Sequence, residues 1–455
     1  MDFSTGINPL LLQRMQERER ERYVASHPKS QQLALQTQGH WLFGVPLHWM
    51  NDWSTPFPLF VQSAQGVDVL DVDGNAYVDF CLGDTGAMFG HSPPSVAAAL
   101  AAQAHLGMTS MLPSADVAVV GALLGERFGL PVWQAAMTAT DANRFALRWA
   151  RAVTGRSKLL VFNGCYHGTV DDVFVDLLAG EPTMRDSLLG QVYPLTEHTE
   201  VIEFNDLAAL ERVLQTESIA CLLAEPVMTN VGMVLPQEGF WQQAQCLCRQ
   251  YGTLLVMDET HTISTGLGGY ARQNGIQADM VVLGKPIGGG MPCAVYGMSA
   301  ELAQRAQQTK EQAPAGHSGI GTTLTANALA FAAMRANLEQ VMTADAYAHM
   351  LPLAALLAQG LRALFAQHGL AWCVTQVGAR VEFQFAATAP RNGTEARAIM
   401  KPEWEQAIHL YCLNRGVLLT PFHNMLLVSP ATETGHIECL LNTLGDGIQQ
   451  LLHGV

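Results

Sequence analysis

The chain carries few charged residues, and the basic ones are the scarcer kind. Of its 455 residues, 14% are charged, with 25 Lys and Arg against 40 Asp and Glu, which gives a formal net charge of -15. A nucleic-acid partner requires a basic surface, so this balance argues against one. No uninterrupted apolar stretch approaches the roughly 20 residues that cross a bilayer, which argues against a membrane-embedded chain.

Paired cysteine motifs are also missing. The nine cysteines are scattered and odd in number, with no Cys-x-x-Cys pair. The N-terminal stretch has no basic start and only a three-leucine apolar run, so it does not read as a signal peptide. We therefore expect reduced thiols and a cytoplasmic protein.

What the chain does contain is a series of short apolar runs that alternate with helical stretches. Each run is about five or six residues long with few polar interruptions, as in a parallel sheet that is covered on both faces. This alternation predicts an open α/β fold. The four runs are residues 159–164, 220–226, 253–259 and 280–285.

The two ends of the chain follow different patterns. Residues 9–36 predict a helix that starts at Pro9, and residues 66–80 predict a hairpin with its turn at Asp73–Gly74. After residue 336 the chain is rich in helix-forming residues and then shows strands near 376–386, 416–420 and 425–429. We predict an N-terminal helix and hairpin segment over 1–80, a large domain over 81–335 and a small C-terminal domain over 336–455, which the N-terminal segment joins.

Two charged residues follow neighbouring strands of the predicted sheet. Asp258 and Lys285 are 27 residues apart, which suits one crossover, and ligands of open α/β sheets bind beyond the carboxyl ends of the strands. Pro286 favours an extended backbone at Lys285, and residues 288–290 are glycines that let a flat ligand approach. A desolvated lysine can form a Schiff base as its neutral amine. From spacing alone, a structural ion pair remains the alternative.

Three further segments fit the binding of a phosphorylated aromatic ligand. Thr138 and Thr140 open a predicted helix over 138–155, which is either a phosphate site or an ordinary threonine cap. Tyr166 follows a strand and can stack on a ring, or it belongs to the core. The glycine-rich stretch 316–327 either contacts phosphate or is a plain loop. Together these features indicate pyridoxal phosphate (PLP), a flat, cationic, phosphorylated aldehyde.

The order of these motifs resembles the class III aminotransferases of fold type I, which include omega-transaminases and glutamate-1-semialdehyde aminomutase. The resemblance covers nearly the whole chain, and its most specific part is the segment from MDETHT to GKPIGGGMP, residues 257–292. It implies a large domain with a mostly parallel, seven-stranded sheet and a smaller α+β domain built from the N- and C-terminal segments. The site would contain no metal.

The resemblance also implies roles for residues around the cofactor ring. Lys285 would form the Schiff base and move the substrate proton, and Asp258 would keep the pyridine nitrogen protonated. The other ring contacts would be Tyr166 on one face with His167 following it in Tyr-His-Gly, Thr260 at the other face, and Glu225 near the ring hydroxyl.

The cofactor phosphate would be held by Thr138, Thr140 and the backbone of Ala139. The family motif Asn-Ser-Gly-Thr-Glu-Ala reads Met-Thr-Ala-Thr-Asp-Ala over residues 137–142, so Ala139 replaces a glycine. Thr323 matches the family threonine that reaches phosphate across a dimer interface, which implies a homodimer with shared active sites.

We therefore predict a transaminase that moves an amino group from an amine or a beta- or omega-amino acid to a keto acid. The alternative is an aminomutase of the glutamate-1-semialdehyde type, and a decarboxylase or racemase also remains open. A metal hydrolase is disfavoured because His167, Asp171, Asp172 and His261 match no metal motif. The candidate substrate residues, each of which core packing or surface charge also explains, are Trp53, Phe89, His261, Arg380 and Phe422.

Overall fold

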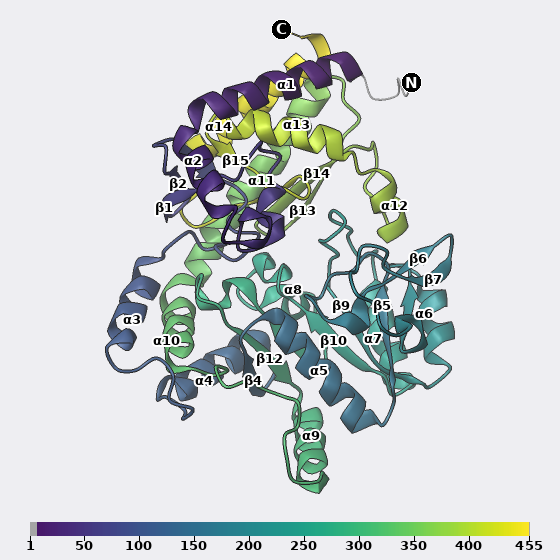
Figure 1. Cartoon of the computed structure of the whole chain (residues 1–455). Coiled ribbons are helices and arrows are strands. Elements are labelled where there is room, and N and C mark those ends of the chain that lie inside the picture. Colours follow the sequence, from purple (N-terminus) through teal and green to yellow (C-terminus); the bar gives the residue numbers. More distant parts are fainter. Residues whose placement is uncertain (1–6, 455) are drawn as a thin grey trace. The chain divides into compact units, whose positions relative to one another are not determined.

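The computed structural model describes residues 7–454, which divide into two compact units (Figure 1). Unit 2 comprises Pro94–Ala344 and Pro390–Ala398. Unit 1 comprises Met1–Pro93, Asp345–Ala389 and Ile399–Val455. Residues 1–6, which open the predicted N-terminal segment, lie outside the described part of the chain.

Unit 2 is built on a seven-stranded sheet with the strand order β4-β12-β11-β10-β9-β5-β8. Every neighbouring pair from β11 to β8 is parallel, whereas β12 runs antiparallel to both β11 and β4. The predicted mostly parallel α/β sheet is thus confirmed. The strands are β4 (Val132–Ala136), β5 (Lys158–Phe162), β8 (Thr199–Ile202), β9 (Ile219–Ala224), β10 (Leu254–Asp258), β11 (Met280–Leu283) and β12 (Ala294–Met298), with a separate hairpin of β6 (Val175–Leu178) and β7 (Glu181–Met184).

Helices alternate with these strands along the chain, as the sequence pattern predicts. They are α3 (Pro94–Ala104), α4 (Asp116–Phe128), α5 (Ala139–Thr154), α6 (Leu207–Leu214), α7 (Phe240–Gln250), α8 (Gly269–Gln273), α9 (Ala300–Gln312), α10 (Ala328–Ala336) and α12 (Gly393–Ala398). Of these, α4, α5, α6 and α7 contact the sheet. Shorter 3-10 segments include η4 (Asp171–Val173), η6 (Thr262–Thr265) and η7 (Lys285–Gly288).

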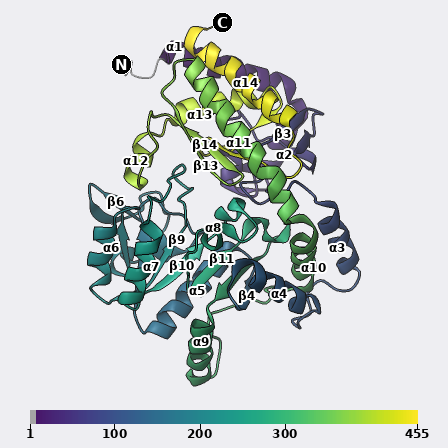
Figure 2. The same cartoon turned by 180° about the vertical axis from the view of Figure 1, so that it is seen from behind.

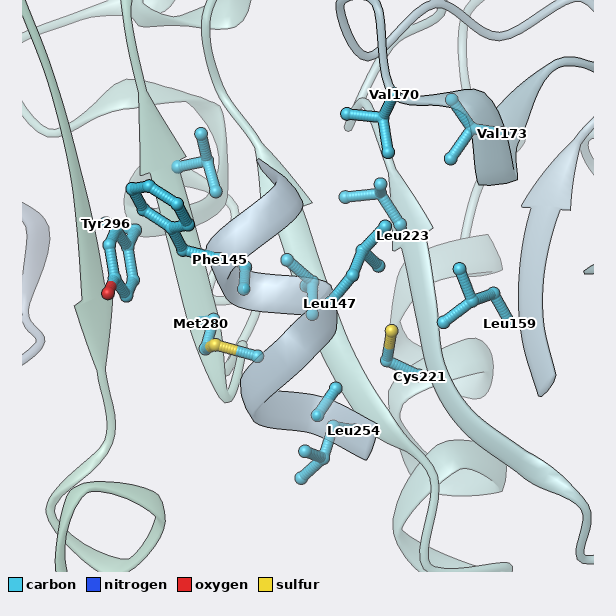
Figure 3. Packing of buried hydrophobic residues seen from close by; sticks show 14 of the residues in the cluster. Phe145, Leu147, Leu159, Val170, Val173, Cys221, Leu223, Leu254, Met280 and Tyr296 are labelled. Atoms are coloured by element: carbon cyan, nitrogen blue, oxygen red, sulfur yellow. The ribbon is translucent and has the colours of Figure 1, made fainter. Parts of the chain in front are cut away.

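Helix α5 packs directly on the sheet because its apolar residues share one face. Phe145 and Leu147 lie among sheet side chains that include Met280 and Leu223, all of them buried (Figure 3). Full burial of each such side chain contributes roughly 1.5–3 kcal/mol. The helix begins where Thr138 caps it by accepting a hydrogen bond from the Asp141 N–H. The packing therefore fixes the N-terminus of α5 at one edge of the sheet.

Unit 1 combines two small sheets with long helices, as the predicted α+β domain requires. Its sheets are β1-β2-β3-β15 and β13-β14-β16. Helices α1, α13 and α14 lie side by side (Figure 1), and α11 packs against α14, where Gly360 approaches Leu441 (Figure 2). The elements are α1 (Pro9–Ser26), α2 (Pro28–Thr37), β1 (Val61–Gln65), β2 (Asp68–Asp71), β3 (Ala76–Asp79), α11 (Ala344–Gln367), β13 (Cys373–Val377), β14 (Arg380–Gln384), α13 (Pro402–Leu413), β15 (Val417–Leu418), β16 (Met425–Leu427) and α14 (Thr434–His453).

Two features of unit 1 differ from a simple interpretation of the sequence. The single helix predicted over residues 9–36 is wrong, because α1 ends at Ser26 and α2 begins at Pro28. Proline has no N–H to donate, so it suits the first turn of a new helix and interrupts the previous one. Helix α11 is, among the described residues, the one helix apolar and long enough to cross a membrane, but one of its faces is buried in unit 1 through residues such as Leu357 and Leu361.

Candidate active site

The ends of three neighbouring strands bring the predicted charged residues of unit 2 together. Asp258 is the last residue of β10 and pairs with Val282 of β11, so Lys285 follows close beyond the end of the adjacent strand. On the other side, β9 ends at Ala224 beside Met257, which places Glu225 next to Asp258. The predicted gathering of polar residues at one edge of the sheet is therefore present.

Lys285 lies in a tight turn rather than in extended backbone. Its φ angle is 39°, in the left-handed region, and it starts the short 3-10 segment η7. The prediction that Pro286 would keep Lys285 extended is therefore wrong. A residue before proline is disfavoured in the right-handed helical region, and here it satisfies that restriction with a positive φ. The turn is closed by a hydrogen bond from the Ile287 N–H to the Gly284 carbonyl.

Asp258 is buried and held by three donors. His167 Nδ1 lies 3.0 Å from Oδ2 of Asp258, and Asn143 Nδ2 donates to the same oxygen at 2.8 Å. The Thr260 N–H donates to Oδ1 at 3.1 Å. Asn143 also donates to the His167 carbonyl at 3.1 Å, so it fixes both members of the pair. The carboxylate is therefore oriented by its neighbours before any ligand contacts it.

These contacts determine the charges of the pair. Burial alone would raise the pKa of Asp258, but the hydrogen bonds and the charge of His167 outweigh burial and lower it to about 2. Burial likewise disfavours the charged form of His167, yet the hydrogen bond and charge of Asp258 raise the pKa of the imidazole to about 10. Near neutral pH the pair is thus a buried carboxylate and imidazolium.

This ion pair should make stability depend on pH in a defined direction. The pKa of Asp258 is lowered from 3.8, so its stabilising contribution is present above that pH and is lost as pH falls towards 2. The pKa of His167 is raised from 6.5, so its contribution is present below that pH and is lost as pH rises towards 10. We expect the destabilisation caused by His167→Gln to be larger at pH 6 than at pH 9, by roughly 2–3 kcal/mol.

The measurement is chemical denaturation of wild type and variant at both pH values, with protein freed of small-molecule ligands. His198→Gln is the matched control, because His198 is exposed and remote from Asp258 in sequence. A difference in unfolding free energy between wild type and His167→Gln that stays constant from pH 6 to pH 9 would contradict the assigned charges.

Glu225 presents an unsatisfied acceptor beside the pair. Thr229 Oγ1 donates to Oε2 of Glu225, whereas Oε1 is buried with no hydrogen-bond partner among residues 7–454. Burial raises the pKa of this carboxyl to about 7. A buried acceptor without a donor costs free energy, so a ligand hydroxyl or N–H at this position would satisfy it.

The N-terminus of α5 lies against the turn that carries Lys285. A Cβ on Gly284 would lie 2.6 Å from the Ala139 Cβ, and a Cβ on Gly168 would lie 2.1 Å from Thr140 Oγ1. Thr138 caps the helix, and Thr140 Oγ1 accepts a hydrogen bond from the Thr169 N–H at 3.1 Å. The first N–H groups of a helix have no partners within it and attract anions. This region can therefore bind a phosphate.

The close approach of Gly284 and Ala139 predicts a specific effect of adding one methyl group. Gly284→Ala should push α5 away from the Lys285 turn and destabilise the protein by about 1–3 kcal/mol, as overpacking does. Gly121→Ala is the matched control, since Gly121 lies within helix α4 and a Cβ added there would meet nothing within 4 Å. The control should instead stabilise by about 0.5–1 kcal/mol. Denaturant unfolding of both variants measures this, and equal effects would contradict the steric argument.

The remaining predicted cofactor residues of unit 2 lie on loops. Tyr166 is 41% exposed and follows β5 by four residues, directly before the buried His167. Thr260 follows Asp258 and is buried. Thr323 is exposed in the loop before α10, where Thr322 and Thr325 bond to each other at 2.9 Å. Its predicted contact with phosphate in a second subunit stays a prediction.

Four of the predicted substrate residues belong to unit 1. Trp53 packs against the core cluster that contains Tyr23, and Phe89 is buried edge-on against Tyr347. These contacts fit the alternative that both are core residues. Arg380 is only 1% exposed, and its Nη2 donates to Thr85 Oγ1. Phe422 is 41% exposed and lines a cavity of about 510 Å³ within unit 1. Their contact with substrate stays a prediction.

His261, the fifth predicted substrate residue, contacts Lys285, and its contact with substrate stays a prediction. Its Nε2 lies 2.7 Å from Lys285 Nζ. The neighbouring Glu259 has a structural role, since it accepts hydrogen bonds from the Tyr270 and Ala271 N–H groups and so caps α8.

The important residue that the sequence analysis missed is Asn143. A signal existed, because Asn143 is a polar residue on the buried, otherwise apolar face of α5.

The comparisons with known proteins agree with this geometry. The family model for aminotransferase class-III matches residues 49–444. The chain belongs to the class III aminotransferases. A curated relative, the glutamate-1-semialdehyde 2,1-aminomutase of Anaeromyxobacter sp. (strain Fw109-5), is 33% identical over 392 residues, which cover 85% of this chain and 89% of that protein.

Two solved structures are similar to this class III aminotransferase over nearly its full length. The crystal structure of a glutamate-1-semialdehyde-aminomutase from Pseudomonas aeruginosa PAO1 is 48% identical, with a TM-score of 0.96, over 98% of this chain and all of that one. A second structure from the same organism is a lysine-to-alanine variant of a glutamate-1-semialdehyde-aminomutase in complex with pyridoxamine phosphate (PMP). It is 47% identical to this chain, with the same TM-score and coverage.

The cofactor of this class III aminotransferase is PLP, and the described residues fit it. Asp258 is an oriented, ionised carboxylate suited to a protonated ring nitrogen. Glu225 Oε1 is a buried acceptor to which no group in the described part of the chain donates, and the N-terminus of α5 is suited to a phosphate. The chain is thus an enzyme of the aminotransferase family, and the prediction of PLP is confirmed.

Proposed function

We propose that the chain is a PLP-dependent aminomutase of the glutamate-1-semialdehyde type. The observation that carries this proposal is the likeness, at 48% identity over 98% of the chain, to a protein described as such an aminomutase. The curated relative at 33% identity carries the same name. Such an enzyme exchanges an amino group and a carbonyl oxygen between neighbouring carbons of one substrate molecule.

These comparisons favour the aminomutase alternative over the intermolecular transaminase that the sequence first suggested. Both reactions require the same lysine, the same carboxylate and the same phosphate site, so the described site does not separate them. The difference is whether the amino group returns to the molecule from which it came. An external keto acid is then unnecessary for turnover.

When bound, PLP supplies a carbonyl that condenses with amines and a cationic ring that accepts electrons from an adjacent carbon. Lys285 provides the amine that anchors it and, once released, moves a proton to and from the reacting carbon. Asp258 holds the ring nitrogen in its protonated state. His167 and Asn143 keep Asp258 ionised and oriented, which preorganises the site electrostatically.

We propose the other cofactor contacts from the positions of the predicted residues in unit 2. Thr138, Ala139 and Thr140 at the start of α5 would hold the phosphate, and Tyr166 and Thr260 would face the ring. Glu225 would accept the ring hydroxyl proton through its unsatisfied oxygen. In support of a homodimer, Thr323 is exposed and available to a second copy.

We further propose that the substrate carries a carboxylate and that the enzyme is cytoplasmic. The substrate is a small amino acid derivative with a carboxylate, for which Arg380 is the candidate ligand. All nine cysteines are free thiols, which supports a reducing cytoplasm.

The deciding experiment supplies glutamate-1-semialdehyde to the purified enzyme with no other amine or keto acid. An aminomutase should convert it to its isomer 5-amino-4-oxopentanoate, which is separated from the substrate by chromatography and identified by its fragmentation in mass spectrometry. Substrate labelled with ¹⁵N should retain its label in the product when unlabelled amines are added. Turnover that occurs only when a keto acid is added would overturn the aminomutase proposal and restore the transaminase.

A further inference from the structure

The amine of Lys285 faces the imidazole of His261 at hydrogen-bond distance. Lys285 Nζ and His261 Nε2 are 2.7 Å apart. Two nitrogen atoms at this separation require a hydrogen atom between them. An ammonium group is a donor only, and a neutral imidazole offers one acceptor nitrogen. The pair can therefore share a single proton between Nζ and Nε2.

The fold holds both members of this pair. His261 precedes η6, where the Ile263 N–H donates to the Glu259 carbonyl at 3.0 Å. Thr262 Oγ1 donates to Oε2 of Glu259 at 2.8 Å, which ties the same turn to α8. Lys285 starts the η7 turn with a positive φ. Neither side chain projects from a long exposed loop, so the contact is built into the ends of β10 and β11.

The contact between His261 and Lys285 can serve to deprotonate the anchor lysine. An ammonium nitrogen has no free electron pair, so the lysine must lose a proton before it can bond to a carbonyl carbon. An imidazole is the side chain best suited to take and return a proton near neutral pH. A base within hydrogen-bond reach of the proton that it removes meets the geometric requirement for general-base catalysis.

We propose that His261 is the proton-transfer residue for Lys285. The Nζ–H bond breaks, an Nε2–H bond forms, and the electron pair left on Nζ becomes available to a carbonyl. The positive charge moves from the ammonium to the imidazolium, so charge and protons balance without a co-reactant. The reverse transfer returns the proton to Lys285. The inference rests on the proposed function only in requiring that Lys285 anchor PLP.

The test separates proton transfer from simple binding by comparing PLP with PMP. PLP must form a covalent bond with Lys285, whereas PMP carries an amine in place of the aldehyde and binds without one. In full-length protein freed of cofactor, His261→Gln should slow covalent attachment of PLP, followed by absorbance, by about 10- to 100-fold at pH 7. The Kd of PMP, measured by calorimetry, should stay within about twofold of wild type.

Two further variants complete the design. In His261→Ala, added imidazole should restore much of the attachment rate, which a purely structural role does not predict. His198→Gln, which changes an exposed histidine of unit 2, should leave attachment and PMP binding unchanged. Circular dichroism and unfolding curves identify any variant that fails to fold, in which case His261→Asn replaces it.

Several outcomes would overturn the proposal. An unchanged attachment rate in His261→Gln would remove the proton-transfer role. Equal losses of PLP attachment and PMP affinity, with no rescue by imidazole, would reduce His261 to a structural residue. The assay contains no amino substrate, so its result does not depend on whether the enzyme is an aminomutase or a transaminase.

Discussion

Lys285→Ala should abolish covalent attachment of PLP and lower turnover by at least about 10⁴-fold. In the proposed mechanism the variant loses both the amine that bonds to the cofactor and the base that moves the substrate proton, each of which contributes orders of magnitude to the rate. Noncovalent PMP binding should persist, because the proposed phosphate site at the start of α5 and Asp258 are unchanged. Turnover, absorbance and the mass of the protein after borohydride reduction with PLP measure these effects.

Lys310→Ala is the matched control for this prediction. Lys310 is an exposed lysine on α9, so its removal should change neither attachment nor turnover. In wild type, peptide mapping after reduction should place the cofactor label on Lys285. A label on any other lysine would contradict the assignment of the anchor.

Asp258→Asn should lower turnover by roughly 10²- to 10³-fold while the protein still binds PLP. An amide has nearly the same shape as the carboxylate but no charge, so it no longer favours the protonated ring nitrogen. The size of the effect is that of removing one preorganised electrostatic contact from an active site. Steady-state kinetics should show the loss mainly in kcat, because the contact acts on charge that develops during the reaction.

The same substitution should also cost stability, because His167 would lose its anionic partner. A buried charge left without its partner typically costs about 3–5 kcal/mol unless it is neutralised. We therefore expect a lower unfolding midpoint near pH 6 and a smaller loss near pH 9, where His167 can be neutral. Asp171→Asn, at the exposed start of η4, is the control and should affect neither rate nor stability. Unchanged turnover in Asp258→Asn would contradict the role of the carboxylate.

The fold of unit 2 was predictable because its buried strands are largely apolar and can be recognised in the sequence. Strands covered on both faces have continuous apolar sequences, and each of the four predicted runs overlaps a strand of the sheet, β5, β9, β10 or β11. Because these strands are parallel, the residues that follow them must meet at one edge. Asp258, Lys285 and Glu225 could therefore be grouped from the sequence alone.

Contacts that depend on local backbone geometry could not be predicted from the sequence. Pro286 restricts Lys285 but does not specify which of the remaining φ values it adopts, and the observed 39° reflects the turn that Gly284 and Gly289 close. The contact between His261 and Lys285 joins residues of adjacent strand ends and has no periodicity to reveal it. Asn143 interrupts the apolar face of α5, but its partners, Asp258 and the His167 carbonyl, lie 115 and 24 residues away along the chain, so the sequence did not show what this amide contacts.

Unit 1 is assembled from segments that lie far apart in the sequence, so it cannot be completed early during synthesis on the ribosome. Strand β3, at residues 76–79, has β15, at residues 417–418, as its parallel neighbour in the sheet. About 340 residues must therefore emerge before β3 acquires this neighbour, whereas the seven strands of the unit 2 sheet are complete by residue 298. Domains tend to fold as their residues become available, so the catalytic sheet should form first. Nascent chains that stall before residue 417 should thus expose an unpaired β3 edge, a site for chaperone capture or aggregation.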